Sequence, residues 1–136
     1  MGIIATTTIQ TLPEAWAGEL VSAEKHYYRT DKPVDAGGKD TALAPYDYLL
    51  ASLASCTMIT LRMYAQHKGI DYGEFAIELH FHANKAGEEW ITRELTFSTP
   101  LDDAAQAKVL DICQKTPSNK NLIARYTYQN IYSLKF

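Results

Sequence analysis

The sequence predicts an α+β fold that consists of a small N-terminal antiparallel sheet, one long helix, a β-hairpin, a second helix and a final strand. Three observations lead to this prediction. Residues 45–69 include a run of fourteen uncharged residues, 48–61, which is long enough for a buried helix. Residues 75–83 alternate between apolar and polar side chains, and residues 99–116 repeat apolar side chains at helical spacing.

Length and composition describe a single domain without a repeat or a linker. The chain has 136 residues, of which 46% are apolar and 21% charged, and a formal charge of −3, so disorder is not expected. A nucleic-acid partner is not expected because the basic excess is missing. The N-terminus has no basic segment followed by a long apolar region, so we expect a cytoplasmic protein. The uncharged run is shorter than the ~20 residues that cross a bilayer, so we expect no membrane partner.

The N-terminal third predicts three short strands. Residues 3–11 are rich in β-branched side chains, and the shorter runs 17–22 and 25–30 complete the sheet. The next loop contains Gly37 and Gly38, which lack the spacing of a phosphate-binding loop and do not lead from a strand into a helix. We interpret these glycines as a turn.

Residues 45–69 predict the long helix. Pro45 suits the first helical position, Asp47 places a negative charge in the first turn, and Gly69 ends the helix. One apolar stripe at spacings of three and four comprises Leu49, Leu53, Cys56, Thr60 and Met63. Further apolar residues extend the surface nearly all the way round, so we expect a buried central helix wrapped by other elements.

Residues 75–83 and 90–98 predict a hairpin with a turn at 84–88. In the first strand Phe75, Ile77, Leu79 and Phe81 face one way, and Glu78, His80 and His82 the other; in the second, Ile91, Leu95 and Phe97 share a side. His80 and His82 could begin a metal site, but no cysteine or acidic cluster accompanies them at ligand spacing. We therefore expect a solvated sheet face and no metal.

The second helix is expected to start at Thr99, with Pro100 in the first position and an acid at Asp102. Its apolar face comprises Leu101, Ala105, Val109, Ile112, Cys113 and Thr116, so Cys113 should lie on the buried side. Pro117 ends this helix. A turn or short helix at 118–125 and a strand at 128–136 complete the chain.

The two cysteines, 57 positions apart, fit neither a disulfide framework nor a zinc site. A single cysteine in an apolar helix, such as Cys56, is usually inert packing. A nucleophilic role would require access for a substrate and a lowered thiol pKa. The helix dipole fades after the first turn, and Cys56 lies about eleven residues inside, so another element must supply a cation.

Four motifs occur in order within residues 31–69. They are an Asp-x-Pro…Gly-Gly-x-Asp loop, a Pro-x-acid-x-Leu-Leu helix start, an Ala-Ser-Cys in mid-helix and an Arg-Met-Tyr-Ala…Lys-Gly exit. With this combination the chain resembles the OsmC/Ohr family of osmotically induced and organic hydroperoxide resistance proteins. The resemblance is strongest over these residues, about a third of the chain.

The resemblance implies that residues 1–136 form one OsmC-like domain and that two copies form an intertwined homodimer. The central helices would pack between sheets, with a peroxide-reducing cysteine in a pocket at the subunit interface. By this resemblance Cys56 is the peroxidatic thiolate, which reduces organic hydroperoxides in preference to hydrogen peroxide. A dithiol reductant would restore the thiol, and no cofactor is implied.

Asp47 stands where the family has an acid that helps to hold an arginine against the thiolate. Arg29 is the first candidate for this arginine, and Lys39 and Arg62 are alternative cations. Nine residues separate Asp47 from Cys56, which places them on opposite sides of a straight helix. Either the helix breaks near its start, or Asp47 serves the partner subunit, or it is only a first-turn charge.

The chain departs from the family pattern near the end of the second helix. The family often carries a resolving cysteine in a Lys-Cys-Pro-x-His-Lys/Arg stretch, and Thr116 stands at the position of that cysteine. Cys113, three residues earlier, is either a displaced resolving thiol or core packing. The resemblance therefore leaves two alternatives to a peroxidase: a noncatalytic protein that binds a small apolar or electrophilic ligand in the interface pocket, and a structural domain.

Overall fold

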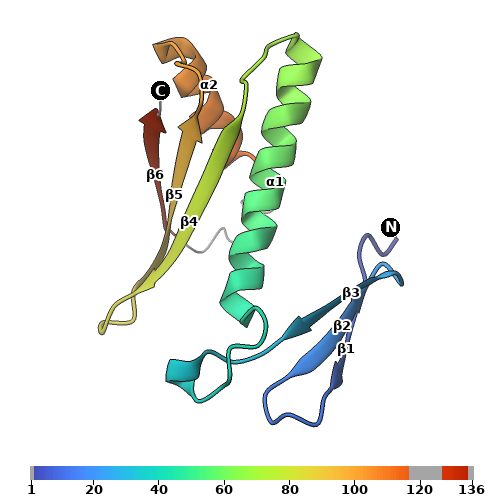
Figure 1. The fold of residues 1–136 in the computed structure, drawn as a ribbon. Helices are drawn as coiled ribbons and strands as arrows, with labels where there is room; N and C mark the ends of the chain where they lie inside the picture. The colour runs from blue at the N-terminus through green and yellow to red at the C-terminus, as the bar shows by residue number, and fades with distance from the viewer. Residues whose placement is uncertain (1, 117–126, 135–136) are drawn as a thin grey trace. The chain divides into compact units, whose positions relative to one another are not determined.

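The computed structural model describes residues 2–116 and 127–134. The chain forms two units, Met1–Leu49 and Leu50–Phe136. Strands are followed by a helix, a hairpin, a second helix and a strand, which confirms the predicted α+β class (Figure 1).

A three-stranded antiparallel sheet makes up most of the first unit. Strands β1 (Thr7–Thr11), β2 (Gly18–Ser22) and β3 (His26–Thr30) lie in the order β1-β2-β3, which confirms the predicted N-terminal sheet. Strand β1 starts later than the expected residue 3, because β2 ends opposite Thr7. A 3₁₀ turn, Val34–Ala36, follows β3, and Gly37 closes it with a φ of 92° that favours glycine, so the prediction of a glycine turn is confirmed.

Helix α1 spans Pro45–Lys68, as predicted, and it is buried along one face only. The buried residues, spaced by four, are Leu53, Thr57, Leu61 and Ala65. The prediction of a helix wrapped nearly all round is wrong for the single chain, because Met58, Ile59 and Met63 are exposed, Met63 to 65%. The reason is that the second unit places its other elements against one side of the helix.

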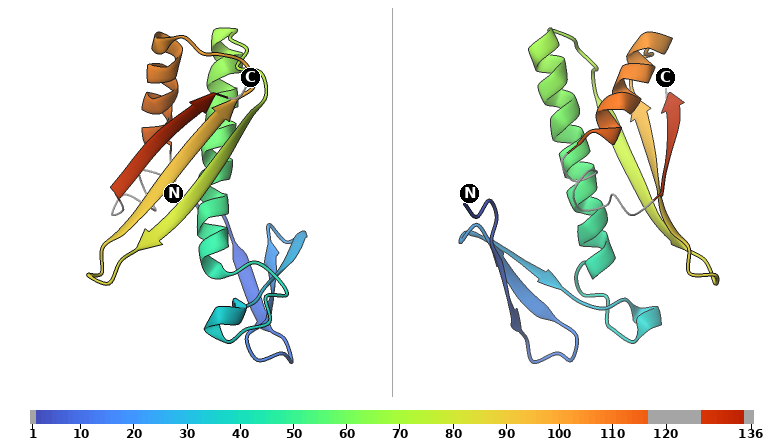
Figure 2. Two further views of the ribbon diagram at one scale, coloured as in Figure 1. Left: turned by 60° about the vertical axis from the view of Figure 1, so that its left-hand side comes forward. Right: turned by 180° about the vertical axis from the view of Figure 1, so that it is seen from behind.

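A mixed sheet and two helices build the second unit. Strands β4 (Phe75–Ala83) and β5 (Glu89–Phe97) form the predicted hairpin, and β6 (Thr127–Leu134) pairs with β5 in parallel, in the order β4-β5-β6. The part of α1 in this unit and helix α2 (Asp103–Gln114) cover the same face of this sheet (Figures 1 and 2).

Helix α2 starts at Asp103, later than the sequence predicted. Asp102 is its N-cap and accepts a hydrogen bond from the Ala105 backbone N–H at 2.7 Å, so the prediction of a start at Thr99 and Pro100 is wrong. Asp102 has an extended backbone conformation, and aspartate is a stronger N-cap residue than the threonine, Thr99, that the sequence suggested. The expected turn or short helix at 118–125 lies outside the described residues.

The apolar core of the second unit joins α1, α2 and β5. Its buried members are Leu61, Ala65, Tyr72, Leu95, Phe97, Val109, Ile112 and Cys113. Phe97 lies at the centre, with its ring 6.1 Å from that of Tyr72 and 5.3 Å from that of Phe75. Within the described residues, neither helix combines the length and the apolar character required to span a bilayer.

Leu61→Ala is expected to lower the free energy of unfolding by about 2–5 kcal/mol, because Leu61 is fully buried and the truncation leaves a cavity. Arg62, the neighbouring residue, is exposed and provides the control. Arg62→Ala should change the free energy of unfolding by no more than about 0.5 kcal/mol. Urea denaturation followed by circular dichroism measures both. Equal effects of the two substitutions would contradict the described face of α1.

Candidate functional site

The two cysteines lie in different environments. Cys56, in the middle of α1, is partly exposed, whereas Cys113 on α2 is fully buried, and neither forms a disulfide. The backbone around Cys56 is regular helix, with the Thr57 hydroxyl donating to the Leu53 carbonyl at 2.8 Å and the Thr60 hydroxyl to the Cys56 carbonyl at 2.7 Å. Of the two thiols, Cys56 is therefore the one that an external molecule can reach.

Apolar side chains follow Cys56 along the exposed side of α1. Met58, Ile59 and Met63 are all at least one-third exposed. A hollow of about 670 Å³ lies between the C-terminal half of α1 and residues 70–75, lined among others by Met58, Arg62, Gln66 and Tyr72. Because it combines apolar and polar groups, this surface can receive a small molecule with an apolar body and a polar end.

Arg93 is a site residue that the sequence reasoning missed. It lies on β5, its side chain is 0% exposed, and its Nη1 atom donates a hydrogen bond to the Thr57 hydroxyl at 3.1 Å. The strand pattern contained the signal, because alternation places Arg93 on the same side as Ile91 and Leu95. Arg93 therefore shares the buried face of β5.

Cys113 is held in its thiol form. Burial raises the pKa of Cys113, and the nearby positive charge of Arg93 opposes this rise without reversing it. The prediction that Cys113 lies on the buried side of the second helix is confirmed. A buried thiol with a raised pKa is a poor nucleophile, because the thiolate is the reactive form.

Asp47 serves the start of α1. Its Oδ2 atom accepts a hydrogen bond from the Ala44 backbone N–H at 2.9 Å, in the first turn of the helix. Helix α1 runs without a break from Pro45 to Lys68, so the alternative of a helix that breaks near its start is wrong. The role of a first-turn charge fits this geometry.

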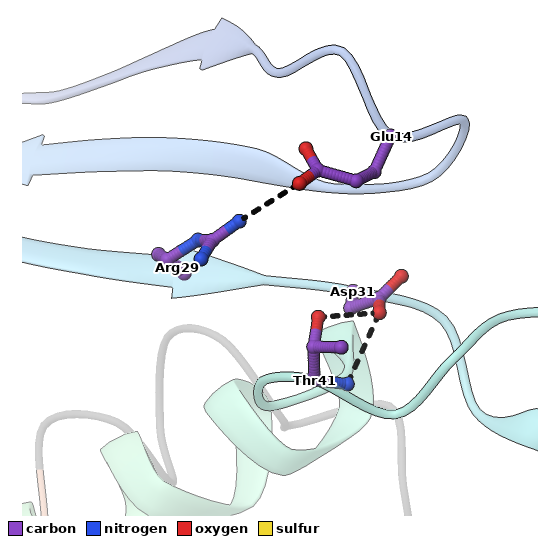
Figure 3. Close-up of polar contacts among 4 residues, drawn as sticks. All are labelled: Glu14, Arg29, Asp31 and Thr41. Carbon is purple, nitrogen blue, oxygen red and sulfur yellow. Dashed lines mark hydrogen bonds and ion pairs between the residues drawn. The ribbon is translucent and has the colours of Figure 1, made fainter.

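Arg29, the first candidate cation, lies exposed on β3. Its Nη2 atom is 3.9 Å from the Glu14 carboxylate (Figure 3). Its backbone carbonyl accepts a hydrogen bond from the Tyr48 hydroxyl. Arg29 and Lys39, a second candidate, line a hollow of about 180 Å³ in the first unit. The third candidate, Arg62, belongs to the second unit and lines the larger hollow there.

The glycine-containing loop is held together by Asp31, which is mostly buried. Its carboxylate accepts hydrogen bonds from the backbone N–H and the hydroxyl of Thr41, at 3.1 and 2.6 Å (Figure 3). It also accepts one from the Lys32 backbone N–H at 2.7 Å. A Cβ atom at Gly38 would lie 1.8 Å from the Lys32 carbonyl oxygen, so glycine is required there. Asp31 and Gly38 thus explain two positions of the loop motif by structure alone.

No metal site forms around the sheet histidines. His80 lies 2.9 Å from the Glu78 carboxylate, and the His82 ring stacks on Trp90 and bonds the Thr92 hydroxyl. Over residues 2–116 and 127–134, no group of three or more His, Cys, Asp or Glu side chains is arranged to hold a metal ion.

The stability of the first unit should depend on the ionisation of Asp31. Its hydrogen bonds, first of all that from the Thr41 hydroxyl, lower the pKa of Asp31 from 3.8 to about 2. The ionised form therefore stabilises the folded state above pH ~4, and this contribution is lost as the pH falls from about 4 to about 2. Carboxyl ¹³C shifts measured against pH should give the low value, and Thr41→Val should raise it. An Asp31 titration midpoint near 3.8 would contradict the hydrogen-bond pattern.

The two thiols should differ in their reaction with an alkylating agent. Cys56 is expected to react with iodoacetamide in the folded protein, whereas Cys113 should react only after unfolding, because it is inaccessible and its pKa is raised. Peptide mass spectrometry at successive times, with a urea-unfolded sample as the control, measures both rates. Comparable rates in the folded protein would be inconsistent with this structure.

Comparisons with known proteins agree with this fold. A crystal structure of a Psychrobacter arcticus protein named for the osmotic stress and detoxification response superimposes with a TM-score of 0.83 over 98% of each chain, at 22% identity. The OsmC-like protein of Mycoplasma pneumoniae has a TM-score of 0.80 over 100% of each chain at 16% identity. An organic hydroperoxide resistance protein OsmC of Legionella pneumophila has 0.73 over 98% of each chain at 15% identity.

At these identities the similar structures establish the fold alone. A search of the curated proteins finds no match. A family model described as OsmC-like protein matches residues 37–131, well over half of the chain, and this span contains the helix start and Cys56. The chain therefore belongs to the OsmC/Ohr family, as its loop, helix start and mid-helix cysteine indicated.

Proposed function

We propose that the chain is a thiol-dependent peroxidase that reduces organic hydroperoxides through Cys56. The observation that carries the proposal is the contrast between the two thiols: Cys56 is accessible in the middle of α1, and Cys113 is sealed in the core. Family membership supports a redox role, and the Legionella pneumophila neighbour is named for organic hydroperoxide resistance.

In the reaction, the Cys56 thiolate attacks the distal oxygen of the hydroperoxide. A sulfur–oxygen bond forms while the oxygen–oxygen bond breaks, and the leaving alkoxide takes a proton to become an alcohol. The sulfur is oxidised to a sulfenic acid, and the peroxide is reduced by two electrons. A dithiol then condenses with the sulfenic acid, releasing water, and its second thiol displaces Cys56 as a thiolate.

The apolar surface beside Cys56 supports both the substrate class and a homodimer. Met58, Ile59 and Met63 are exposed on the side of α1 that the second unit leaves uncovered. Apolar groups of this size favour an organic hydroperoxide over hydrogen peroxide. A second copy of the chain would cover the same side and complete a pocket, as proposed for the intertwined dimer.

Arg29 and Asp47 are proposed to assist from the first unit. The pairing of Arg29 with Glu14 is long and solvent-exposed, and such pairs contribute only about 0–1 kcal/mol, so the guanidinium can exchange partners. Asp47 would retain its first-turn role while interacting with this arginine in the dimer.

Resolution by Cys113 would require rearrangement of the core. Cys113 is fully buried, and Thr116 occupies the family's usual position of the resolving cysteine. We therefore propose that an external dithiol regenerates Cys56 directly. A reducing cytoplasm supplies such thiols, and two free cysteines are compatible with that compartment.

One observation favours a second function, a noncatalytic protein that binds a small apolar or electrophilic ligand. The hollow of about 670 Å³ beside α1 has the size of a small-molecule site, and the chain lacks the usual second cysteine. In this reading Cys56 would be an ordinary thiol that takes no part in catalysis.

Cys56→Ser should abolish the consumption of cumene hydroperoxide in the presence of a dithiol, because the nucleophile is removed, while circular dichroism stays unchanged. Cys113→Ser is the matched control and should retain most of the activity. Mass spectrometry after one equivalent of peroxide should show a sulfenic acid on Cys56. Turnover that survives in Cys56→Ser would eliminate the peroxidase, and a slow, peroxide-insensitive Cys56 would favour the ligand-binding protein. A Cys56–Cys113 disulfide would instead assign resolution to Cys113.

A further inference from the structure

The apolar layer between the sheet and the two helices contains a buried cation. Arg93 projects from β5 on the side of Ile91 and Leu95, is 0% exposed, and donates from Nη1 to the Thr57 hydroxyl at 3.1 Å. Thr57 is itself fully buried and also donates to the Leu53 carbonyl. The guanidinium is thus fixed against the middle of α1 within one unit of the chain.

The position of Arg93 limits its distance from Cys56. Thr57 follows Cys56 directly, and consecutive Cα atoms are about 3.8 Å apart. With the 3.1 Å hydrogen bond, the guanidinium nitrogen lies no more than about 12 Å from the Cys56 sulfur. At an effective dielectric constant of ~20, a unit charge at that distance shifts a pKa by about one unit.

We propose that Arg93 is a positioning residue for the Cys56 thiol: its guanidinium holds Thr57, and its buried positive charge favours the thiolate one residue away. This inference rests on the proposed role of Cys56 as the reactive thiol. It assigns the stabilising charge to a buried residue in the same unit as the cysteine, whereas the candidates from the sequence were Arg29 and Lys39 of the first unit and the exposed Arg62 of the second. A buried charge is screened by salt far less than an exposed one, so its effect should persist at physiological ionic strength.

Among the described residues, the neighbours of Arg93 come from the sheet and from both helices. In the backbone register Arg93 pairs with Leu79 of β4 and Asn130 of β6, while α1 contributes the Thr57 hydroxyl and α2 the Cys113 thiol. Of these, only Cys113 ionises, and it interacts electrostatically with Tyr72. Lys108 of α2 and Lys115 at its C-cap each pair with the partly exposed carboxylate of Asp111.

The test is an NMR titration of ¹³Cβ-labelled cysteine, which uses no peroxide. In the unmodified protein, the pKa of Cys56 is expected below the ordinary value of ~8.5. Arg93→Met should raise it by about one unit, which lowers the thiolate fraction at pH 7 about tenfold, and Arg93→Lys should restore most of the shift. Lys115→Met, which removes an exposed cation at the end of α2, is the control and should leave the pKa of Cys56 unchanged.

Replacing a buried charge with an apolar residue of similar volume is often tolerated, and circular dichroism checks the fold of each variant. Arg93→Gln is the second neutral variant, because it removes the charge and keeps a polar donor group at this position. Cys113 provides an internal reference, since loss of Arg93 must raise its pKa further.

An unshifted Cys56 pKa in a folded neutral variant overturns the inference, and so does a Cys56 pKa at or above ~8.5 in the unmodified protein. Failure of hydroperoxide turnover with a shifted Cys56 pKa would reject the peroxidase and leave the role of Arg93 standing.

Discussion

The packing of one face of α1 against β5 and α2 is the constraint on which the second unit depends. Leu61 and Ala65 of the helix meet Phe97 of the strand and Val109 of α2 in one apolar cluster. Burial of this surface is the main favourable term in the stability of the unit. Because the helix is rotationally fixed by that contact, Cys56 is placed at the edge of the buried face, where it is neither sealed nor fully exposed.

The same packing buries the positive charge of Arg93 in the protein interior, where charged side chains are rare. Moving a guanidinium out of water is costly unless hydrogen bonds and other charges compensate, and Arg93 meets the Thr57 hydroxyl in the layer beneath α1. A charge in such surroundings acts on its neighbours more strongly than at the surface. Of the two thiols, Cys113 is the one on which this charge has a described effect, since it opposes the rise of the Cys113 pKa that burial causes.

The first unit follows a different principle, since hydrogen bonds organise it more than an apolar core. The carboxylate of Asp31 ties the loop after β3 to Thr41, and Gly38 permits the close approach of the Lys32 carbonyl. Two positions of the loop motif that identified the family are thus explained: the aspartate accepts hydrogen bonds from the backbone of the loop, and the glycine allows close packing. Arg29, one of the exposed cations of this unit, lines a hollow together with Asp31 and Thr41.

Local pattern was sufficient to predict the strands, both helices, the glycine turn, the buried side of Cys113 and the family, because strand alternation, helical spacing and motif order are written in neighbouring residues. The face of α1 that is buried and the burial of Arg93 were not predicted, because each depends on partners distant in the chain. The start of α2 was placed too early because Thr99 and Pro100 offer the same local capping pattern as the true cap, Asp102. Alternation along β5 contained the position of Arg93, but only the packing of both helices on that face turned a polar interruption into a buried charge against Thr57. The environment of Cys56 was decided in the same way, because the direction in which a helix faces follows from what covers it.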